Sequence, residues 1–214
     1  MESRLNGSRR ERAGGRRHRR LRGATAAAHE ALDVTLREAA CFASAEGYRR
    51  YLTAVEPLYA SVEAELGAAG ATRLLPDWPR RRKLDLICAD LRVLGGADGA
   101  PRQRAAAARM GTLPAPGWCV GAMFGTIYVL EGATLGGALL ARALRGLGVL
   151  SQGRACLLDP YGAERGAMWR AFLARLEDVV MTRQQEEALS AGALATFSLF
   201  AGVGASLVDR GGAR

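Results

Sequence analysis

Apolar residues recur every three or four positions in six stretches of the chain. This spacing predicts amphipathic helices, because it places the apolar side chains on one face of each helix. No stretch of useful length alternates between apolar and polar residues, as a half-buried strand would. The predicted helices cover about residues 25–43, 48–66, 84–94, 118–144, 169–180 and 189–207. The sequence therefore predicts an all-α fold, a compact bundle of about six helices.

The longest predicted helix is also the most apolar. Residues 117–141 contain one charged residue, Glu131, and the uncharged run before it has 14 residues. A membrane-spanning helix needs about 20 predominantly apolar residues. Together with the glycines of this segment and its central carboxylate, the short run favours a buried helix over a membrane span, and we expect no membrane association.

The basic residues are concentrated at the N-terminus. Of the 30 Lys and Arg residues, nine Arg lie in residues 1–23, together with two Glu, whereas the rest of the chain is close to neutral. A self-repelling segment without apolar periodicity is typical of disorder. We therefore expect a basic disordered tail at 1–23 and a helical domain at 24–210. Binding of RNA or of an anionic surface by the tail is an alternative function, and any contact with nucleic acid is expected to be weak.

Cysteine and histidine usage limits the chemistry. The four cysteines, Cys41, Cys88, Cys119 and Cys156, form no close pair, so a clustered zinc site is not expected. Scattered cysteines without a secretory signal are typical of a reducing compartment, so we expect a cytoplasmic protein. His18 falls in the predicted tail, which leaves one histidine for the predicted domain.

Glycines form an unusual face on the longest predicted helix. Gly121, Gly125, Gly132 and Gly136 lie at helical spacing, with Tyr128 between them. Each interior glycine costs a helix roughly 1 kcal/mol relative to alanine, so a close approach to the backbone must offset that loss. Two interpretations are open: a neighbouring helix packs against this face, or a flat ligand lies on it.

The remaining histidine lies among apolar residues. His29 is on the predicted apolar stripe of the first helix, with Leu32 and Leu36. It is either a hydrogen-bonded core residue or an axial ligand of an iron whose in-plane ligands come from a porphyrin. Asp33, one turn further on, could accept the other imidazole N–H and fix the ring. With the glycine face opposite, these residues would enclose a planar macrocycle.

Four segments carry a resemblance to a known family. They are LRGATAAAHEALD at 21–33, PDWPRRRKLDLICADLRVLG at 76–95, GTIYVLEGATLGG at 125–137 and YGAERGAMWRAFLARLE at 161–177. The chain resembles the biliverdin-producing haem oxygenases of bacteria, and within them the branch associated with bacterial phytochromes. The resemblance covers about residues 21–208.

The resemblance implies roles for individual residues. His29 would be the proximal ligand of the haem iron. Gly132 and Gly136 would lie where the distal helix crosses and kinks over the haem, at the catalytic position, while Tyr128 and Arg22 would contact the haem propionates. The family usually has serine at the position of Ala133, and a hydroxyl there could organise water or dioxygen.

The implied reaction is oxidative opening of haem to biliverdin, carbon monoxide and ferrous iron. Haem b would be both substrate and cofactor. Electrons would come from an external donor such as a ferredoxin, a reductase or an ascorbate-like reductant, and a bacteriophytochrome could receive the bilin. One alternative is a non-catalytic haem-binding or haem-trafficking protein of the same fold. Another is an α-helical interaction module whose glycine face packs a partner helix while its basic tail binds nucleic acid.

Overall fold

The computed structural model describes residues 15–95, 118–151 and 156–211. These ranges are almost entirely helical, and their only β-type pairing is an isolated bridge between Cys156 and Asp159. The predicted all-α fold is therefore confirmed. The helices are α2 (Arg16–Glu38), α3 (Ala45–Ala68), α4 (Ala71–Leu74), α5 (Trp78–Arg81), α6 (Leu84–Val93), α8 (Val120–Gly146), η1 (Gly162–Glu164), α9 (Arg165–Asp178) and α10 (Arg183–Gly211).

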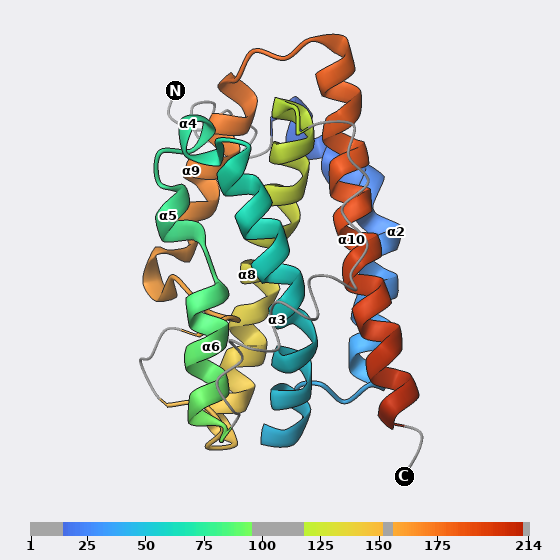
Figure 1. The fold of residues 1–214 in the computed structure, drawn as a ribbon, viewed down its shortest axis with the longest axis vertical. Coiled ribbons are helices and arrows are strands. Elements are labelled where there is room, and N and C mark those ends of the chain that lie inside the picture. Colours follow the sequence, from blue (N-terminus) through green and yellow to red (C-terminus); the bar gives the residue numbers. More distant parts are fainter. Residues whose placement is uncertain (1–14, 96–117, 152–155, 212–214) are drawn as a thin grey trace, which may run out of the picture.

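Two long helices, α8 and α10, form the most extensive contact in the molecule. α10 also packs along α2 and against α3, so it joins the first, second and longest predicted helices (Figure 1). Its inward side chains are those that the periodicity predicted. They are Leu189, Ala193, Phe197, Phe200 and Leu207, all buried.

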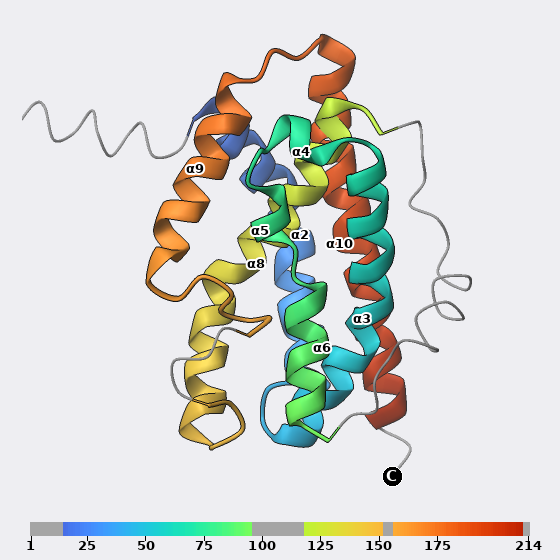
Figure 2. The same ribbon diagram turned by 60° about the vertical axis from the view of Figure 1, so that its left-hand side comes forward.

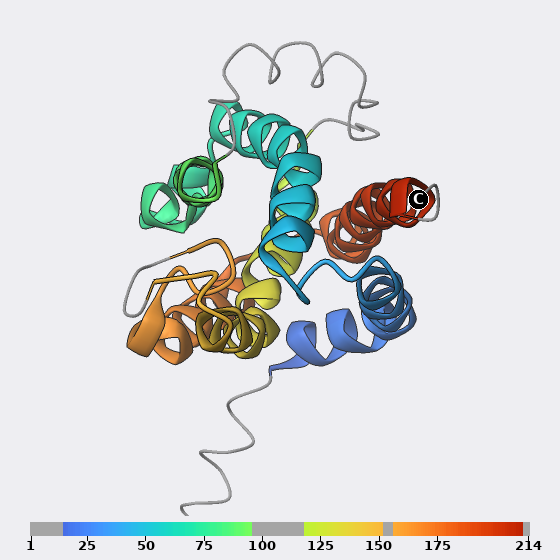
Figure 3. The same ribbon diagram turned by 90° about the horizontal axis from the view of Figure 1, so that it is seen from below.

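α2 and α8 run in the same direction and cross in the upper half of the molecule (Figure 2). At the crossing, the Tyr128 hydroxyl of α8 lies beside Thr25 and Arg22 of α2. Beyond it, α2 packs on α10, and the ribbons of α2 and of the second half of α8 stand apart when the molecule is seen from below (Figure 3). α8 changes direction partway along its length in Figure 2.

The expected tail boundary is wrong. α2 begins at Arg16, so residues 16–23 are helical and Thr25 lies inside the helix. Arg17 explains the early start, because its guanidinium is buried against the end of α9. Its Nη1 donates to the carbonyl oxygens of Leu176, Glu177 and Val179, each at 2.8 Å. Residues 1–14 of the predicted tail lie outside the described residues.

The other predicted boundaries differ from the observed ones by up to six residues, the largest difference being at the start of α10, and some residues predicted on the apolar faces are exposed. α9 ends at Asp178, so Val180, predicted as a core residue, lies beyond the helix with 92% of its surface exposed. Gly95 has a positive φ of 71° and ends the segment after α6, as its predicted cap role requires. The predicted loop at 97–116 lies outside the described residues.

Two of the described helices, α8 and α10, are long and apolar enough to cross a membrane by length and composition. Core helices of globular proteins meet the same criterion. Because α8 and α10 pack against each other, their apolar character has an explanation within the fold.

Candidate active site

The first half of α8 uses its glycines for helix packing. A methyl group on Gly121 would overlap the backbone carbonyl oxygen of Gln185 in α10, and one on Gly125 would overlap that of Leu189. From the other side, a methyl group on Gly192 of α10 would come within 2.6 Å of the carbonyl oxygen of Ala122. For this half of the helix, packing against a neighbouring helix is the correct interpretation.

In the second half of α8, Gly132 and Gly136 have different surroundings from Gly121 and Gly125. A Cβ on Gly132 would meet only the Trp169 ring, at 3.9 Å, and a Cβ on Gly136 would have no neighbour within 4 Å. Leu135 and Leu139, which share this face, are 41% and 74% exposed. Within the described residues, no packing contact therefore requires glycine at these two positions, and the face combines bare backbone with exposed apolar side chains.

His29 lies at the edge of the apolar stripe of α2 and not within it. Its side chain is 62% exposed, so the expected burial among apolar residues is wrong. Its Nδ1 lies 3.2 Å from Oδ2 of Asp33, and its ring meets the edge of Phe197 at a centroid distance of 6.0 Å. A carboxylate at Nδ1 favours the tautomer whose Nε2 carries a free lone pair. No described residue hydrogen-bonds to that Nε2.

Tyr128 and Arg22 are brought together at the crossing of α8 and α2. Tyr128 is buried there, and burial raises the pKa of its hydroxyl, while a hydrogen bond with Thr25 and the charge of Arg22 act in the opposite direction. Arg22 itself is exposed. The arrangement therefore presents one cation and one phenol at the end of the face that carries His29.

His29 and Gly132 each follow the contact between α2 and α8 by four residues. His29 is one turn beyond Thr25 in α2, and Gly132 is one turn beyond Tyr128 in α8. Four residues of α-helix span about 6 Å. Because the two helices run in the same direction from the contact between Tyr128 and Thr25, each residue follows that contact by about one turn of its own helix.

The family model described as Heme oxygenase matches residues 17–205 of this chain. The chain belongs to the haem oxygenase family. A heme oxygenase from Xanthomonas campestris pv. campestris is 33% identical over 158 residues, which are 73% of this chain and 87% of that protein. Heme oxygenase PigA from Pseudomonas aeruginosa is 27% identical over 192 residues, 86% of this chain and 89% of that protein.

Two solved structures share the fold. The NO- and CO-bound heme oxygenase from Neisseria meningitidis aligns with a TM-score of 0.71 and 22% identity, over 89% of this chain and 91% of its own. Heme oxygenase from Leptospira interrogans aligns with a TM-score of 0.64 and 19% identity, over 87% and 97% of the two chains. Family membership makes this chain a haem oxygenase, an enzyme of haem degradation, and favours that activity over the non-catalytic alternative. The narrower placement in the phytochrome-associated branch stays a prediction.

Sequence reasoning missed one residue that lies beside Tyr128. His18, assigned to the tail, lies in α2 with its ring 6.1 Å from that of Tyr128 and 5.8 Å from that of Trp169. A second histidine is thus present in the folded domain, contrary to expectation. The signal was available, since His18, Arg22, Thr25 and His29 repeat at spacings of four, three and four. Its Nδ1 is buried without a hydrogen bond, and burial, followed by the charge of Arg22, lowers its pKa.

The residues around Ala133 provide no replacement for the serine that the family usually has. Ala133 is exposed next to Gly132, and the hydroxyl of Thr134 is buried and donates to the carbonyl oxygen of Glu131 at 2.7 Å. That hydroxyl is therefore engaged within its own helix. Within the described residues, no three His, Cys, Asp or Glu side chains are grouped as a protein-only metal site would require.

Proposed function

We propose that haem binds between α2 and the second half of α8, with His29 as the axial ligand of its iron. The observation that carries this assignment is the contact of Tyr128 with Thr25, because His29 and Gly132 each follow one of these residues by one helical turn. On the α2 side lies an imidazole with an open Nε2, and on the α8 side lies helix backbone without a side chain. This pair suits a flat ligand that is bound through its centre on one face.

Different residues of the chain would bind different parts of the haem. Asp33 holds Nδ1 of His29 and so orients the ring and sets its tautomer. Arg22 and the hydroxyl of Tyr128 are suited to the two carboxylates of haem, because a cation and a phenol can donate charge-assisted hydrogen bonds to them. Leu135 and Leu139 would cover the apolar part of the macrocycle.

Bound haem would supply the iron that uses dioxygen and external electrons to open the ring to biliverdin, carbon monoxide and ferrous iron. The described stretch of α8 from Gly132 to Gly136 contains no titratable side chain. Protons at this face would therefore have to pass through water held by backbone groups. Gly132 and Gly136 let the ligand approach that backbone, which is the catalytic role we assign to them.

We further propose that the protein acts in the cytoplasm with a soluble electron donor, a ferredoxin, a reductase or an ascorbate-like reductant. None of the four cysteines, all of which lie in the described ranges, forms a disulfide, which fits a reducing compartment. We keep a bacteriophytochrome as the proposed acceptor of the bilin, because segment 76–95 resembles that branch.

The assignment is tested by titrating the purified protein with hemin and then adding ascorbate in air. We expect a Soret band at one haem per chain, a weaker or shifted band for His29→Ala, and a bilin spectrum after reduction of the wild type. Gly202→Ala is the matched control, since Gly202 is an exposed glycine of α10 whose Cβ would have no neighbour within 4 Å. A stable haem spectrum without bilin would leave only a haem-binding protein, and no Soret band would remove both haem functions.

A further inference from the structure

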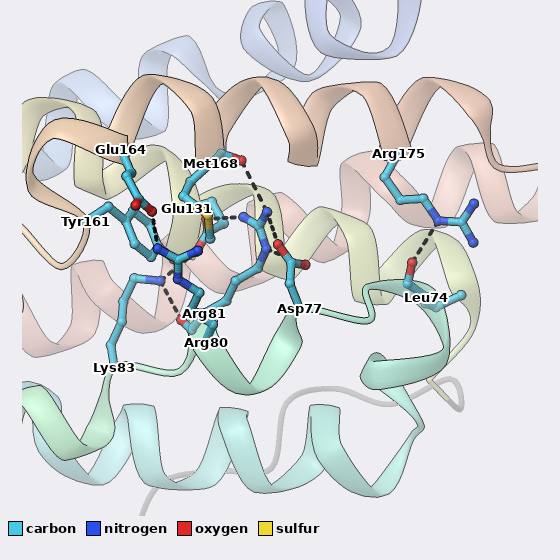
Figure 4. A network of polar contacts seen from close by, with 10 residues as sticks. All are labelled: Leu74, Asp77, Arg80, Arg81, Lys83, Glu131, Tyr161, Glu164, Met168 and Arg175. Atoms are coloured by element: carbon cyan, nitrogen blue, oxygen red, sulfur yellow. Dashed lines mark hydrogen bonds and ion pairs between the residues drawn. The ribbon is translucent and has the colours of Figure 1, made fainter.

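A buried cluster of charged side chains lies beside α8, one residue before Gly132. Arg81, Lys83 and Glu131 are all at most 2% exposed. Nη1 of Arg81 lies 2.5 Å from Oε2 of Glu131, and Nζ of Lys83 lies 2.6 Å from Oε1 (Figure 4). The Tyr161 hydroxyl donates to the same Oε1 at 2.9 Å. One carboxylate of α8 is thus bound by three donors from outside the helix.

The same guanidinium also binds α9. Nη2 of Arg81 donates to the carbonyl oxygen of Met168 at 3.2 Å and to Oδ2 of Asp77 at 2.7 Å (Figure 4). Met168 precedes Trp169, the residue whose ring a Cβ on Gly132 would meet. Arg81 therefore binds Glu131, which precedes Gly132 in α8, and Met168, which precedes Trp169 in α9.

The charges within this cluster balance, since Arg81 and Lys83 face Glu131 and Asp77. Burial and the charge of Glu131 raise the pKa of Tyr161, so its hydroxyl stays protonated and remains a donor. Buried ion pairs nevertheless stabilise a fold little, because desolvation of the charges opposes their attraction. Such a cluster does fix the orientation of the carboxylate, because each donor binds it in one geometry.

The orientation of the helix matters here because, within the described residues, the face of α8 that carries Gly132 and Gly136 is not covered by packed side chains. A side chain at Gly132 would have one neighbour and one at Gly136 none, so packing does not restrain this face of the helix. The opposite face does pack, because Thr134 is buried and Gly137 lies against the carbonyl oxygen of Leu158. We propose that Arg81, Lys83 and Tyr161 act through Glu131 as positioning residues that fix the backbone of α8 at Gly132 and Gly136 over the haem. This inference rests on the proposed haem site and adds residues that do not touch the ligand.

Two substitutions change the hydrogen-bond geometry around Glu131 without changing the net charge of the cluster. Tyr161→Phe removes one hydrogen bond to Glu131 and changes no charge. Arg81→Lys keeps the charge and removes the planar fork that joins Glu131, Asp77 and Met168. The matched control is Arg80→Gln, because Arg80 lies in the same short helix and also pairs with a residue near α9, Glu164, but is exposed and does not contact Glu131.

The first readout is the ferrous CO complex, whose C–O stretching frequency reports the distal surroundings of the haem. We expect Tyr161→Phe and Arg81→Lys to shift this frequency and to change the ratio of biliverdin isomers, with hemin affinity within about twofold of wild type. A displacement of about 1 Å can cost a hundredfold in rate, so turnover is expected to fall roughly ten- to a hundredfold. Arg80→Gln should match the wild type in every measurement.

The second readout needs no haem. Amide hydrogens at residues 131–136 should exchange faster in ligand-free Tyr161→Phe than in the wild type or in Arg80→Gln. If Arg81→Lys does not fold, Tyr161→Phe decides. A folded Tyr161→Phe with wild-type C–O frequency, isomer ratio and exchange would overturn the positioning role and leave the haem site standing. Failure of the wild type to bind hemin would instead overturn the proposed function, and this inference with it.

Discussion

The two halves of α8 carry glycines at the same spacing for two different reasons. In the first half, Gly121 and Gly125 let the backbone of α10 approach so closely that no side chain would fit. In the second half, Gly132 and Gly136 stand beside almost nothing, although each still weakens the helix. A glycine that the fold requires and a glycine that only a ligand would require can thus follow each other in one helix, and the surrounding structure alone tells them apart.

The comparison extends to the apolar residues between the glycines. Phe124 and Ile127 in the first half are completely buried, whereas Leu135 and Leu139 in the second half are exposed. Exposed apolar side chains beside bare backbone are typical of a surface that binds a partner or ligand. The first half of α8 is therefore core. The second half is core on the side of Thr134, Gly137 and Ala141, and its other face, with Gly132 and Gly136, is the proposed wall of the haem site.

The largest effect is expected for Gly125→Ala. Its methyl group would overlap the carbonyl oxygen of Leu189, and the overlap is with backbone, which cannot move aside without shifting α10. Overpacking of this kind costs about 1–3 kcal/mol or more. Urea unfolding followed by circular dichroism should show that loss in the free energy of unfolding. Wild-type stability of Gly125→Ala would contradict the close packing of α8 on α10.

Gly136→Ala should act in the opposite way. With no neighbour within 4 Å, the methyl group costs nothing in packing and raises helix propensity, so unfolding should become more difficult by up to about 1 kcal/mol. Hemin affinity and bilin formation should fall, because the methyl group would lie between the ligand and the backbone. Gly202→Ala, measured beside it, should show the stability gain without the loss of function. Equal hemin binding by both variants would remove Gly136 from the site.

Much of the fold was predictable, because each helix carries its own period. The periodicity gave the inward residues of α10 and the extent of α8 to within two residues at each end. The start of α2 was not predictable in the same way. Arg17 is ordered by carbonyl groups about 160 residues away in sequence, and no local pattern reveals them. An arginine-rich segment is typical of disorder until such partners are known.

The site was predictable in composition and less so in geometry. His29, Asp33 and the glycine face were all identified from the residue pattern, but His29 was expected inside the apolar stripe. In the structure, Ala28 and Leu32 are partly buried against the core, whereas His29, next to Ala28 around the helix, has a side chain that is 62% exposed. A rotation of about 100° between adjacent residues decides between a core histidine and an accessible one. The periodicity of a short stripe does not determine that rotation.

A smaller effect is expected for Leu139→Gln. Leu139 is 74% exposed, and surface substitutions usually change stability by no more than about 0.5 kcal/mol. The free energy of unfolding should therefore stay near that of the wild type, while hemin binding weakens a few-fold because an apolar contact is lost. Leu135→Gln should behave alike. A large loss of stability would show that this face is core, as in the first half of α8.

The smallest effect is expected at the crossing between the two halves, where His18 lies against Tyr128 and Trp169. Burial, followed by the charges of Arg22 and Arg19 against that of Glu177, lowers the pKa of His18 below its ordinary value of 6.5. The unfolded chain therefore takes up this proton first as the pH falls. The contribution of neutral His18 to stability is complete above pH 6.5 and declines below it until the folded protein is also protonated.

The measurement is the free energy of unfolding of wild type and His18→Gln between pH 8 and pH 5. The free energy of unfolding of the wild type should fall relative to that of His18→Gln as the pH falls through about 6.5. Carboxylates titrate at lower pH in both proteins, so they cancel in the difference. Parallel pH profiles would show that the ring is equally solvated in both states. His18 would then be a surface residue at the edge of α2, and the crossing would lack the buried aromatic contact that separates the packed half of α8 from the open half.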